Sequence, residues 1–400
     1  MASAISNLVN KQILRGYNIS KTVPHVQNIL NKYDNIIKVE IPVELENGEK
    51  ENIIGYRAQH NNILGPYKGG IRYVPNLHID DTTTLAKWMT VKCALQNLPL
   101  GGGKGGIMFD PNNPKYSEKD IEQITRKYTQ QLVTHIGPDK DIPAPDVNTN
   151  SKMMDWISDE YCSLTKTDDI HVVTGKTLLN GGIQGRTEAT GNGIMFAIER
   201  WSNANNFSLQ GKTFVIQGFG NVGYHIAKKL QENGMTLIGV GDHNGYIKTY
   251  SDADTGKINE IDASHLKGFL KHHPITKYHE VIDKFTSPIK VVNTNKSDFF
   301  KTNCDIVILA AKELEITREN AGDLNCNLVV EGANGPIDLE GDNILTARNI
   351  PVIPDILANS GGVQVSYYEY LQNQEKTLHS YDYVEKMLRD KMYKTTDDVL

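Results

Sequence analysis

The sequence has few cysteines, no long apolar run and no excess of positive charge. Its cysteines are too far apart to match the spacing of a metal or redox motif. They are Cys93, Cys162, Cys304 and Cys326. This usage is typical of a reducing compartment in which thiols stay free. No apolar stretch is long enough to span a bilayer, and the net charge of −6 gives no support for a nucleic-acid or anionic-membrane partner.

The first nineteen residues contain Lys11 and Arg15 but no acidic side chain. That composition faintly resembles a transit peptide. The same stretch also predicts a plain amphipathic helix, because apolar residues recur at helical spacing, at Ile5, Leu8, Val9 and Ile13. We favour the helix and therefore expect a cytoplasmic protein.

The length and the hydrophobic pattern predict two α/β domains. The chain has 400 residues, of which 39% are apolar and 22% charged, and this is enough for two sizeable cores. The first part predicts helices and strands in the order of two helices within 1–34, strands at 36–44 and 52–59, and helices at about 80–97 and 118–137. Residues 174–193 are polar and dense in glycine, so we place the junction there. The expected domains are 1–186 and 187–400.

Lys104 is flanked by five glycines in the order Gly101-Gly102-Gly103-Lys104-Gly105-Gly106. Glycine lets another molecule approach the backbone closely, so the ammonium should face either water or a ligand. A flexible surface loop with a solvated lysine is the simplest interpretation. The flanking residues are apolar, however, whereas a linker would have Ser, Glu or Gln there. We therefore expect a clamped loop that carries a functional lysine.

Two other charged residues are candidates to act with Lys104. Lys92 falls three residues after Met89, on the apolar face of the preceding helix. A lysine at such a position often extends its head group to water, but the Lys104 segment follows next, which favours a shared anion site. Asp146 lies in the proline-rich run 141–148, which is stiff because proline fixes φ. It is either a turn cap or an acid–base partner of Lys104.

The second domain begins with a nucleotide-binding motif. An apolar strand at 213–217 runs into Gly218-Phe219-Gly220-Asn221-Val222-Gly223, and a helix and another strand follow. This G-x-G-x-x-G motif in its proper setting predicts a Rossmann-type, doubly wound dinucleotide-binding domain, with the pyrophosphate on the helix N-terminus. Asp242 would bind a ribose 2′-hydroxyl and repel a 2′-phosphate. We therefore expect NAD, with NADP as the alternative because His243 is adjacent.

Three further short apolar strands are expected at about 304–309, 327–330 and 350–353. Each ends at a polar, glycine-rich or small-residue edge, as in a parallel doubly wound sheet, in which ligands bind at the carboxyl ends of the strands. Asn334 and Asn359 lie shortly after the last two strands. They are either turn residues or ligands of a nicotinamide carboxamide or ribose.

Several motifs, in this order and spacing, resemble the glutamate, leucine, phenylalanine and valine dehydrogenase family. They are GPYKGGIRY, VKCALQNLPLGGGKGGI, DIPAPDV, GGIQGRTEATGNG, QGFGNVG, VVEGANGP and IPDILANSGGVQVSYYEY. The resemblance covers roughly residues 5–395 and is greatest to the glutamate-specific members. It implies NAD(P)-dependent, reversible oxidative deamination of L-glutamate to 2-oxoglutarate and ammonium. The active site would lie in a cleft between a substrate-binding and oligomerisation domain and an NAD-binding domain.

The resemblance also implies roles for individual residues. Lys104 would be the catalytic lysine, Asp146 its proton-transfer partner, and Lys92 the ligand of the α-carboxylate. Lys68 and Ser366 would hold the distal carboxylate. The remaining contacts would be Gly69 and Met89 for the substrate, and Thr190, Gly218, Phe219, Gly220, Asn221, Val222, Gly223, Asp242, Asn334 and Asn359 for the cofactor.

The chemistry implied for Lys104 depends on a lowered pKa. Burial and crowded cations should both lower the pKa of Lys104, so that its neutral amine can deprotonate the water that attacks a substrate imine. Because hydride passes directly from carbon to the nicotinamide, no metal is needed.

Departures from the family pattern leave alternatives open. Ile183 stands where the family usually has a small hydroxyl residue, and the family continues beyond Leu400 with a helix that we expect to be absent here. A leucine- or phenylalanine-type dehydrogenase is disfavoured by Lys68 and Ser366. A catalytically impaired relative with a binding or regulatory role is the other alternative. The resemblance implies a homohexamer, whereas the favoured direction and any effectors stay open.

Overall fold

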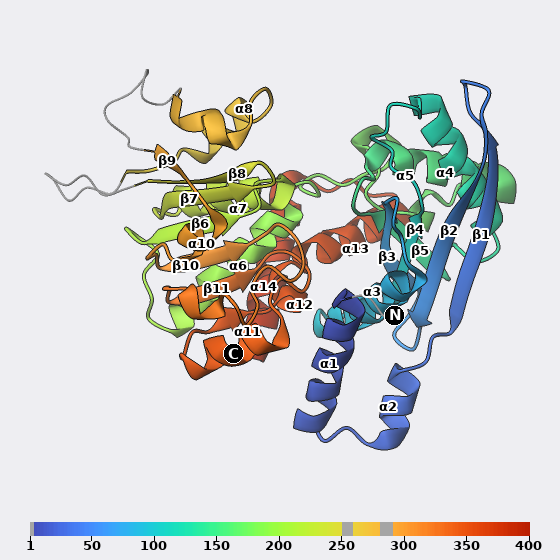
Figure 1. Cartoon of the computed structure of the whole chain (residues 1–400). Helices are drawn as coiled ribbons and strands as arrows, with labels where there is room; N and C mark the ends of the chain where they lie inside the picture. The colour runs from blue at the N-terminus through green and yellow to red at the C-terminus, as the bar shows by residue number, and fades with distance from the viewer. Residues whose placement is uncertain (1–3, 250–258, 281–290) are drawn as a thin grey trace, which may run out of the picture. The chain divides into compact units, whose positions relative to one another are not determined.

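A computed structural model describes residues 4–249, 259–280 and 291–400, and the chain forms two compact units (Figure 1). Unit 1 comprises Met1–Arg186 and Val363–Val384, and unit 2 comprises Thr187–Gly362 and Glu385–Leu400. The expected division at 186/187 coincides with one unit boundary. The segment Val363–Val384, which we expected in the second domain, belongs with unit 1, because its apolar side chains pack in a cluster with Cys93, Leu100 and Ile142.

Unit 1 is built on a five-stranded sheet of order β1-β2-β4-β3-β5. The strands are β1 (Asn35–Glu44), β2 (Lys50–Asn61), β3 (Tyr67–Tyr73), β4 (Gly101–Ile107) and β5 (Asp141–Pro145). β1 and β2 form the hairpin predicted from their alternating pattern, with Ile41 opposite Ile53. β3 runs parallel to both β4 and β5. The prolines of β5 are accommodated because this strand is at the sheet edge.

Helices cover both faces of this sheet (Figure 1). The helices of unit 1 are α1 (Ala4–Ile19), α2 (Pro24–Leu30), α3 (Ile79–Leu95), α4 (Glu118–Leu132), α5 (Ser151–Thr165) and most of α13 (Gly361–Gln374), and of these α1 and α2 project beyond the sheet. A Cβ at Gly102 of β4 would meet Thr90 of α3, whereas a Cβ at Gly105 would meet Tyr128 of α4. Since side chains alternate along a strand, α3 and α4 lie on opposite faces. The pair of N-terminal helices expected from the sequence is confirmed.

Unit 2 is built on a seven-stranded sheet of order β12-β11-β10-β6-β7-β8-β9. The strands are β6 (Thr213–Gln217), β7 (Thr236–Asp242), β8 (Gly245–Thr249), β9 (Val291–Thr294), β10 (Ile306–Leu309), β11 (Leu328–Glu331) and β12 (Val352–Ile353). The five strands from β12 to β7 are parallel. β8 and β9 are antiparallel, so the fully parallel sheet expected from the sequence needs correction at this edge.

The helices of unit 2 follow the strands in the alternating order of a doubly wound fold. They are α6 (Ala189–Ala204), α7 (Asn221–Glu232), α8 (Ala263–Phe269), α10 (Lys296–Phe300), α11 (Leu339–Ala347), α12 (Asp355–Ala358) and part of α14 (Tyr381–Val399). The buried strands β10 and β11 contribute Val307, Leu309 and Val329 to the apolar core. Within the described ranges, no helix combines the length and the hydropathy needed to cross a membrane.

Candidate active site

Four charged residues share one face of the unit 1 sheet. β3 and β4 pair in parallel with Lys68 opposite Gly102, two residues before Lys104. Because side chains alternate along strands, Lys68, Arg72 and Lys104 all point to the face that α3 covers. Asp146 directly follows β5, the parallel neighbour of β3 on the other side. The register of three strands therefore brings these charges together.

Lys104 and Asp146, which sequence reasoning paired, are in contact. Lys104 Nζ donates a hydrogen bond to Asp146 Oδ2, and Arg72 Nη2 lies 3.5 Å from the same oxygen. The Asp146 backbone N–H donates to Thr149 Oγ1 at 2.7 Å. This hydrogen bond closes a turn that holds the backbone of Asp146 in position. A Cβ at Gly70 would lie 2.7 Å from Asp146 Cβ. Only glycine at position 70 lets this carboxylate come so close to β3.

Burial and neighbouring cations act together on the Lys104 ammonium. Its side chain is 7% exposed. Desolvation, followed by the positive charges of Arg72 and Lys92, lowers the pKa of Lys104 well below 10.5. Lys92 comes from α3 and is buried, as expected for its inward face. The direction of the shift is the one expected from the sequence, and it increases the fraction of neutral amine, the form that acts as a base.

The glycines around Lys104 form a strand, so the expectation of a loop was wrong. β4 is buried along its whole length, and none of its glycines has a positive φ. A Cβ at Gly102 would lie 2.1 Å from Thr90 Oγ1, and one at Gly105 would lie 2.7 Å from the Tyr128 hydroxyl. Close packing of α3 and α4 against the strand, and not backbone freedom, requires glycine at these positions.

Lys68 is a second buried lysine, with 1% of its surface exposed. Its Nζ donates to the carbonyl oxygens of Ile142, at 3.2 Å, and Pro143, at 3.5 Å. Burial, with the charges of Arg186 and Arg57, lowers the pKa of Lys68 to about 7. An arriving carboxylate would favour the ammonium form. Lys68 is therefore suited to bind an anion.

Ser366 reaches the same region from far along the chain. It lies on α13 and is 2% exposed, and its Oγ accepts a hydrogen bond from Arg186 Nε at 3.1 Å. Burial lowers the pKa of Arg186, whereas the charge of Glu369 raises it. Arg186 thus donates a hydrogen bond to Ser366 and also acts through its charge on Lys68. Sequence reasoning assigned no role to Arg186, although it lies within the motif GGIQGRTEATGNG.

Beneath these cations, Arg57 and Asp141 form an ion pair in which both side chains are 0% exposed. Arg57 Nε donates to Asp141 Oδ2 at 2.8 Å, and its Nη1 donates to the Gly69 carbonyl at 3.1 Å. Gln59 Nε2 also donates to Asp141 Oδ2 at 2.8 Å. This network fixes Gly69 in β3. Met89 lies on α3, packed against the apolar cluster that includes α13.

In unit 2, the three motif glycines meet three different requirements. Gly218 has a φ of +97°, and a Cβ there would lie 2.4 Å from the Ala310 carbonyl carbon. Gly220 is the N-cap of α7, and a Cβ there would meet nothing within 4 Å. A Cβ at Gly223 would lie 1.9 Å from Gly218 O. Between them, Phe219 is buried, and Asn221 and Val222 begin the helix.

Two more residues expected at the cofactor, Thr190 and Asp242, lie near this turn. Asn221 Nδ2 donates to the Thr187 carbonyl at 2.7 Å, shortly before α6, whose second residue is Thr190. Asp242 ends β7, the neighbour of β6. Its Oδ1 accepts from two backbone N–H groups of the following turn, at 2.7 and 3.1 Å. Asp242 is thus a turn cap as well as an acid at the carboxyl edge of the sheet.

Asn334 and Asn359 meet beyond the ends of β11 and β12. Asn359 Nδ2 donates to Asn334 Oδ1 at 3.1 Å. Two buried acids hold the surrounding chain: Asp355 Oδ2 accepts from the Gly335 N–H at 2.8 Å, and Glu331 Oε2 accepts from the Asp355 N–H at 2.9 Å. Burial, with the charge of Asp355, raises the pKa of Glu331 well above 4.5. Sequence reasoning missed the role of both acids, although Glu331 belongs to the motif VVEGANGP.

These residues fit NAD. The open backbone at Gly220 lies at the N-terminus of α7, where a pyrophosphate binds in such folds. The amide groups of Asn334 and Asn359 would hold a nicotinamide carboxamide. Among the residues that the structure describes, no group of three or more His, Cys, Asp and Glu side chains could hold a metal ion, and all four cysteines are free.

The chain is similar to solved and curated dehydrogenases over nearly its whole length. It is 38% identical over 364 residues, 91% of this chain and 83% of the relative, to an NAD-specific glutamate dehydrogenase of Staphylococcus aureus. It is also 38% identical over 371 residues, 93% of this chain and 83% of the relative, to a catabolic NAD-specific glutamate dehydrogenase of Bacillus subtilis.

Solved structures give the same result. The glutamate dehydrogenase of Peptoniphilus asaccharolyticus has a TM-score of 0.80 at 34% identity, over 99% of this chain and 91% of that one. The leucine-bound hetero-hexameric glutamate dehydrogenase of Thermus thermophilus has a TM-score of 0.86 at 28% identity, over 98% and 89%. Residues 33–163 match the Glu/Leu/Phe/Val dehydrogenase dimerisation domain, and residues 181–400 match the Glutamate/Leucine/Phenylalanine/Valine dehydrogenase domain. The chain belongs to the Glu/Leu/Phe/Val dehydrogenase family.

Proposed function

We propose that this protein catalyses the NAD-dependent, reversible oxidative deamination of L-glutamate to 2-oxoglutarate and ammonium. The observation that carries the proposal is the group of buried Lys68, buried Ser366 and partly buried Arg186 in the unit that also holds Lys104 and Asp146. A buried cation without an anion is costly. A substrate with a second carboxylate therefore suits this site better than an aliphatic amino acid. Similarity to NAD-specific glutamate dehydrogenases supports the same substrate and cofactor.

The proton transfers are assigned to Lys104 and Asp146. With its lowered pKa, Lys104 as a neutral amine removes a proton from the water that attacks the substrate imine. Asp146, in hydrogen-bond contact with Lys104, exchanges protons with the substrate amine. Expulsion of ammonium then leaves the 2-oxo acid.

Substrate positioning is assigned to the other residues of the same sheet face. Lys92 binds the α-carboxylate, Lys68 and Ser366 bind the distal carboxylate, and Gly69 and Met89 line the space between. Arg186, through its hydrogen bond to Ser366, adds a further cation at the distal end. Both ends of a five-carbon dicarboxylate would thereby be fixed while its Cα reacts.

The cofactor contacts are assigned to the turn of residues 218–223, to Thr190 and Asp242, and to the pair Asn334 and Asn359. When bound, NAD accepts the hydride from the substrate Cα, and NADH returns it in the reverse reaction. Asp242 favours NAD because its carboxylate would repel a 2′-phosphate.

We infer assembly as a homohexamer, because the similar Thermus thermophilus enzyme is described as hetero-hexameric and residues 33–163 match a dimerisation domain. We expect the protein to be located in the cytoplasm, where its proposed substrates are found. The net charge of −6 supports neither nucleic acid nor an anionic membrane as a partner.

The test is an assay of the purified protein with 2-oxoglutarate, ammonium and NADH, followed by loss of the reduced cofactor. NADPH in place of NADH measures cofactor preference, and we expect a higher kcat/KM with NADH. A folded preparation without turnover with either cofactor would instead indicate the catalytically impaired relative. Turnover with 2-oxoisocaproate but not with 2-oxoglutarate would indicate the leucine type.

A further inference from the structure

Glu369 is a buried acid in unit 1 to which the proposed reaction gives no role. It lies on α13 three residues after Ser366 and four before Asn373, so all three side chains emerge from one side of the helix. Neither Glu369 nor its ion-pair partner Lys176 exposes any side-chain surface. Buried charges of this kind destabilise a fold unless they are fully paired. The contacts of Glu369 therefore show which parts of the chain the ion pair holds in place.

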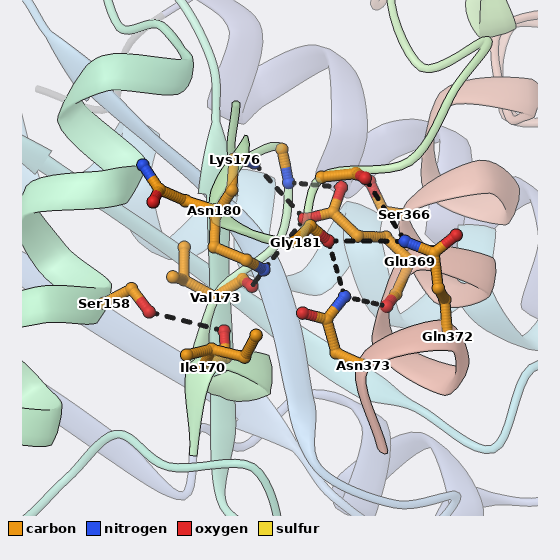
Figure 2. A network of polar contacts seen from close by, with 12 residues as sticks. Ser158, Ile170, Val173, Lys176, Asn180, Gly181, Ser366, Glu369, Gln372 and Asn373 are labelled. Atoms are coloured by element: carbon orange, nitrogen blue, oxygen red, sulfur yellow. Dashed lines mark hydrogen bonds and ion pairs between the residues drawn. The ribbon is translucent and has the colours of Figure 1, made fainter. Parts of the chain in front are cut away.

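The Glu369 carboxylate binds one short segment of the chain (Figure 2). Its oxygens accept hydrogen bonds from the Gly175 N–H at 2.8 Å, the Lys176 N–H at 3.2 Å and Lys176 Nζ at 2.9 Å. Lys176 Nζ also donates to the Val173 carbonyl at 2.7 Å. Each of the three donors fits the ionised form of the acid. Glu369 thus fixes α13 to residues 173–176 through two backbone groups and one cation.

Residues 173–176 in turn lie against β5. The Thr174 N–H donates to the Pro143 carbonyl at 3.1 Å, and a Cβ at Gly175 would lie 2.4 Å from Pro145 Cδ. Lys68 donates to the same stretch of β5, at Ile142 and Pro143. β5 ends immediately before Asp146. The segment that Glu369 holds is therefore one of the supports of the Asp146 turn.

The same helix carries Ser366, the residue assigned to the distal carboxylate of the substrate. Through Glu369, the position of Ser366 is tied by a fixed chain of contacts to the strand that ends at Asp146. We propose that Glu369 and Lys176 are positioning residues that set the spacing between the distal-carboxylate end and the proton-transfer end of the site, and so select the length of the dicarboxylate. This inference rests on the proposed glutamate dehydrogenase activity.

Two variants with opposite expected results test this spacing. Glu369→Asp keeps the charge but shortens the side chain by one methylene, so α13 and residues 173–176 can no longer keep their separation. Glu369→Gln combined with Lys176→Met removes both charges but keeps the side-chain length and one acceptor oxygen. The amide nitrogen takes the place of one carboxylate oxygen, so one of the two backbone hydrogen bonds, from Gly175 or Lys176, is lost and the other is kept. Lys176→Arg lengthens the cationic side chain and keeps its charge. Like Glu369→Asp, it changes the spacing without removing a charge.

The readout is the ratio of kcat/KM for L-glutamate to that for L-2-aminoadipate, which is one methylene longer. Because displacements of about 1 Å can change rates by up to two orders of magnitude, we expect Glu369→Asp and Lys176→Arg to lower this ratio about tenfold or more. The double variant should keep the wild-type ratio. Asn373→Ala is the matched control, because it removes an uncharged contact of α13, the 2.7 Å hydrogen bond to the Gly181 carbonyl.

Three outcomes would overturn the inference alone. Glu369→Asp could lower kcat/KM for both substrates in the same proportion, which indicates a general structural role. The double variant could lose discrimination as Glu369→Asp does, in which case charge and not length matters. Asn373→Ala could lose substrate discrimination to the same extent. In that case, any loss of a contact of α13 would be enough to lower discrimination. A wild-type protein without glutamate turnover would instead overturn the proposed function and this inference with it.

Discussion

Residues 101–106 in unit 1 and residues 218–223 in unit 2 are both rich in glycine, but their glycines serve different purposes. In β4, the glycines have no positive φ, and a Cβ would collide with α3 at Gly102 and with Tyr128 of α4 at Gly105. At the β6–α7 turn, Gly218 has a positive φ and Gly220 borders open space. The first segment needs glycine for close packing, and the second needs it for a turn and for access by a ligand.

The two segments also differ in charge. β4 carries Lys104, whose pKa is lowered by its own burial and by the charges of Arg72, Lys92 and Lys68. The turn at 218–223 has no charged side chain and offers only backbone N–H groups at a helix N-terminus. Under the proposed function, unit 1 would supply the reacting side chains, whereas unit 2 would supply a cofactor surface formed by backbone atoms. Four substitutions test this contrast, and we order them by expected effect.

Lys104→Met should lower kcat about 10³-fold, because it removes the base while a side chain of similar size fills the site. NADH binding, measured by fluorescence titration, should not change, since the nucleotide motif lies in unit 2. Lys87→Met is the matched control, because Lys87 is also buried on this side of the sheet but pairs with Asn10 and Asn31. Loss of NADH binding in Lys104→Met would mean that this lysine is structural.

Gly102→Ala should destabilise the protein by about 3 kcal/mol, the upper part of the range for overpacked cores. The added methyl would lie 2.1 Å from Thr90 Oγ1 and 2.3 Å from the Ala86 carbonyl. Chemical denaturation measures the change. Gly16→Ala, in α1 where a Cβ meets nothing within 4 Å, should be neutral or slightly stabilising. Equal stability of Gly102→Ala and wild type would contradict the packing explanation.

Lys68→Met should raise stability by about 1–2 kcal/mol, because burying this ammonium costs free energy, and should raise the KM for glutamate. The pKa of Lys68 is lowered to about 7 from 10.5, so the folded state binds fewer protons than the unfolded state between these values. The cost of the charged lysine is complete below pH 7 and disappears as pH rises to 10.5. The stability difference between variant and wild type should shrink accordingly in melts at increasing pH, and a constant difference would refute this account.

Gly220→Ala should weaken NADH binding about tenfold, or about 1.4 kcal/mol, without changing the melting temperature. A methyl at position 220 meets no protein atom within 4 Å but would occupy the approach to the helix N-terminus. Gly268→Ala, at another open position of unit 2, is the control and should leave binding unchanged. If Gly220→Ala lowered the melting temperature but left the affinity for NADH unchanged, Gly220 would be required for packing, as the glycines of β4 are. The proposed difference between the two segments would then be wrong.

Local patterns were enough to predict much of the fold. β6 spans the expected residues, and the β1–β2 hairpin follows from alternation around a glycine turn. The antiparallel strands β8 and β9 were missed because they form the sheet edge, where the apolar pattern is weak. Lys104 and Asp146 could be paired because each stood in a conspicuous glycine or proline setting. Arg57 had no such setting, and Arg186 and Glu369 stood within motifs that were quoted without separating their roles.

By itself, the sequence determined part of the order of helices and strands, the nucleotide motif with its acid at Asp242, and the lysines that indicate an anionic substrate. Each of these depends on residues close together in the chain. Only the tertiary structure decided that the glycines around Lys104 form a buried strand, and that Val363–Val384 belongs with unit 1. The physical reason is the same in both cases. Whether a glycine can be replaced by a larger residue depends on atoms that come from distant parts of the chain. The positions of Ser366 and Glu369 depend on such atoms as well.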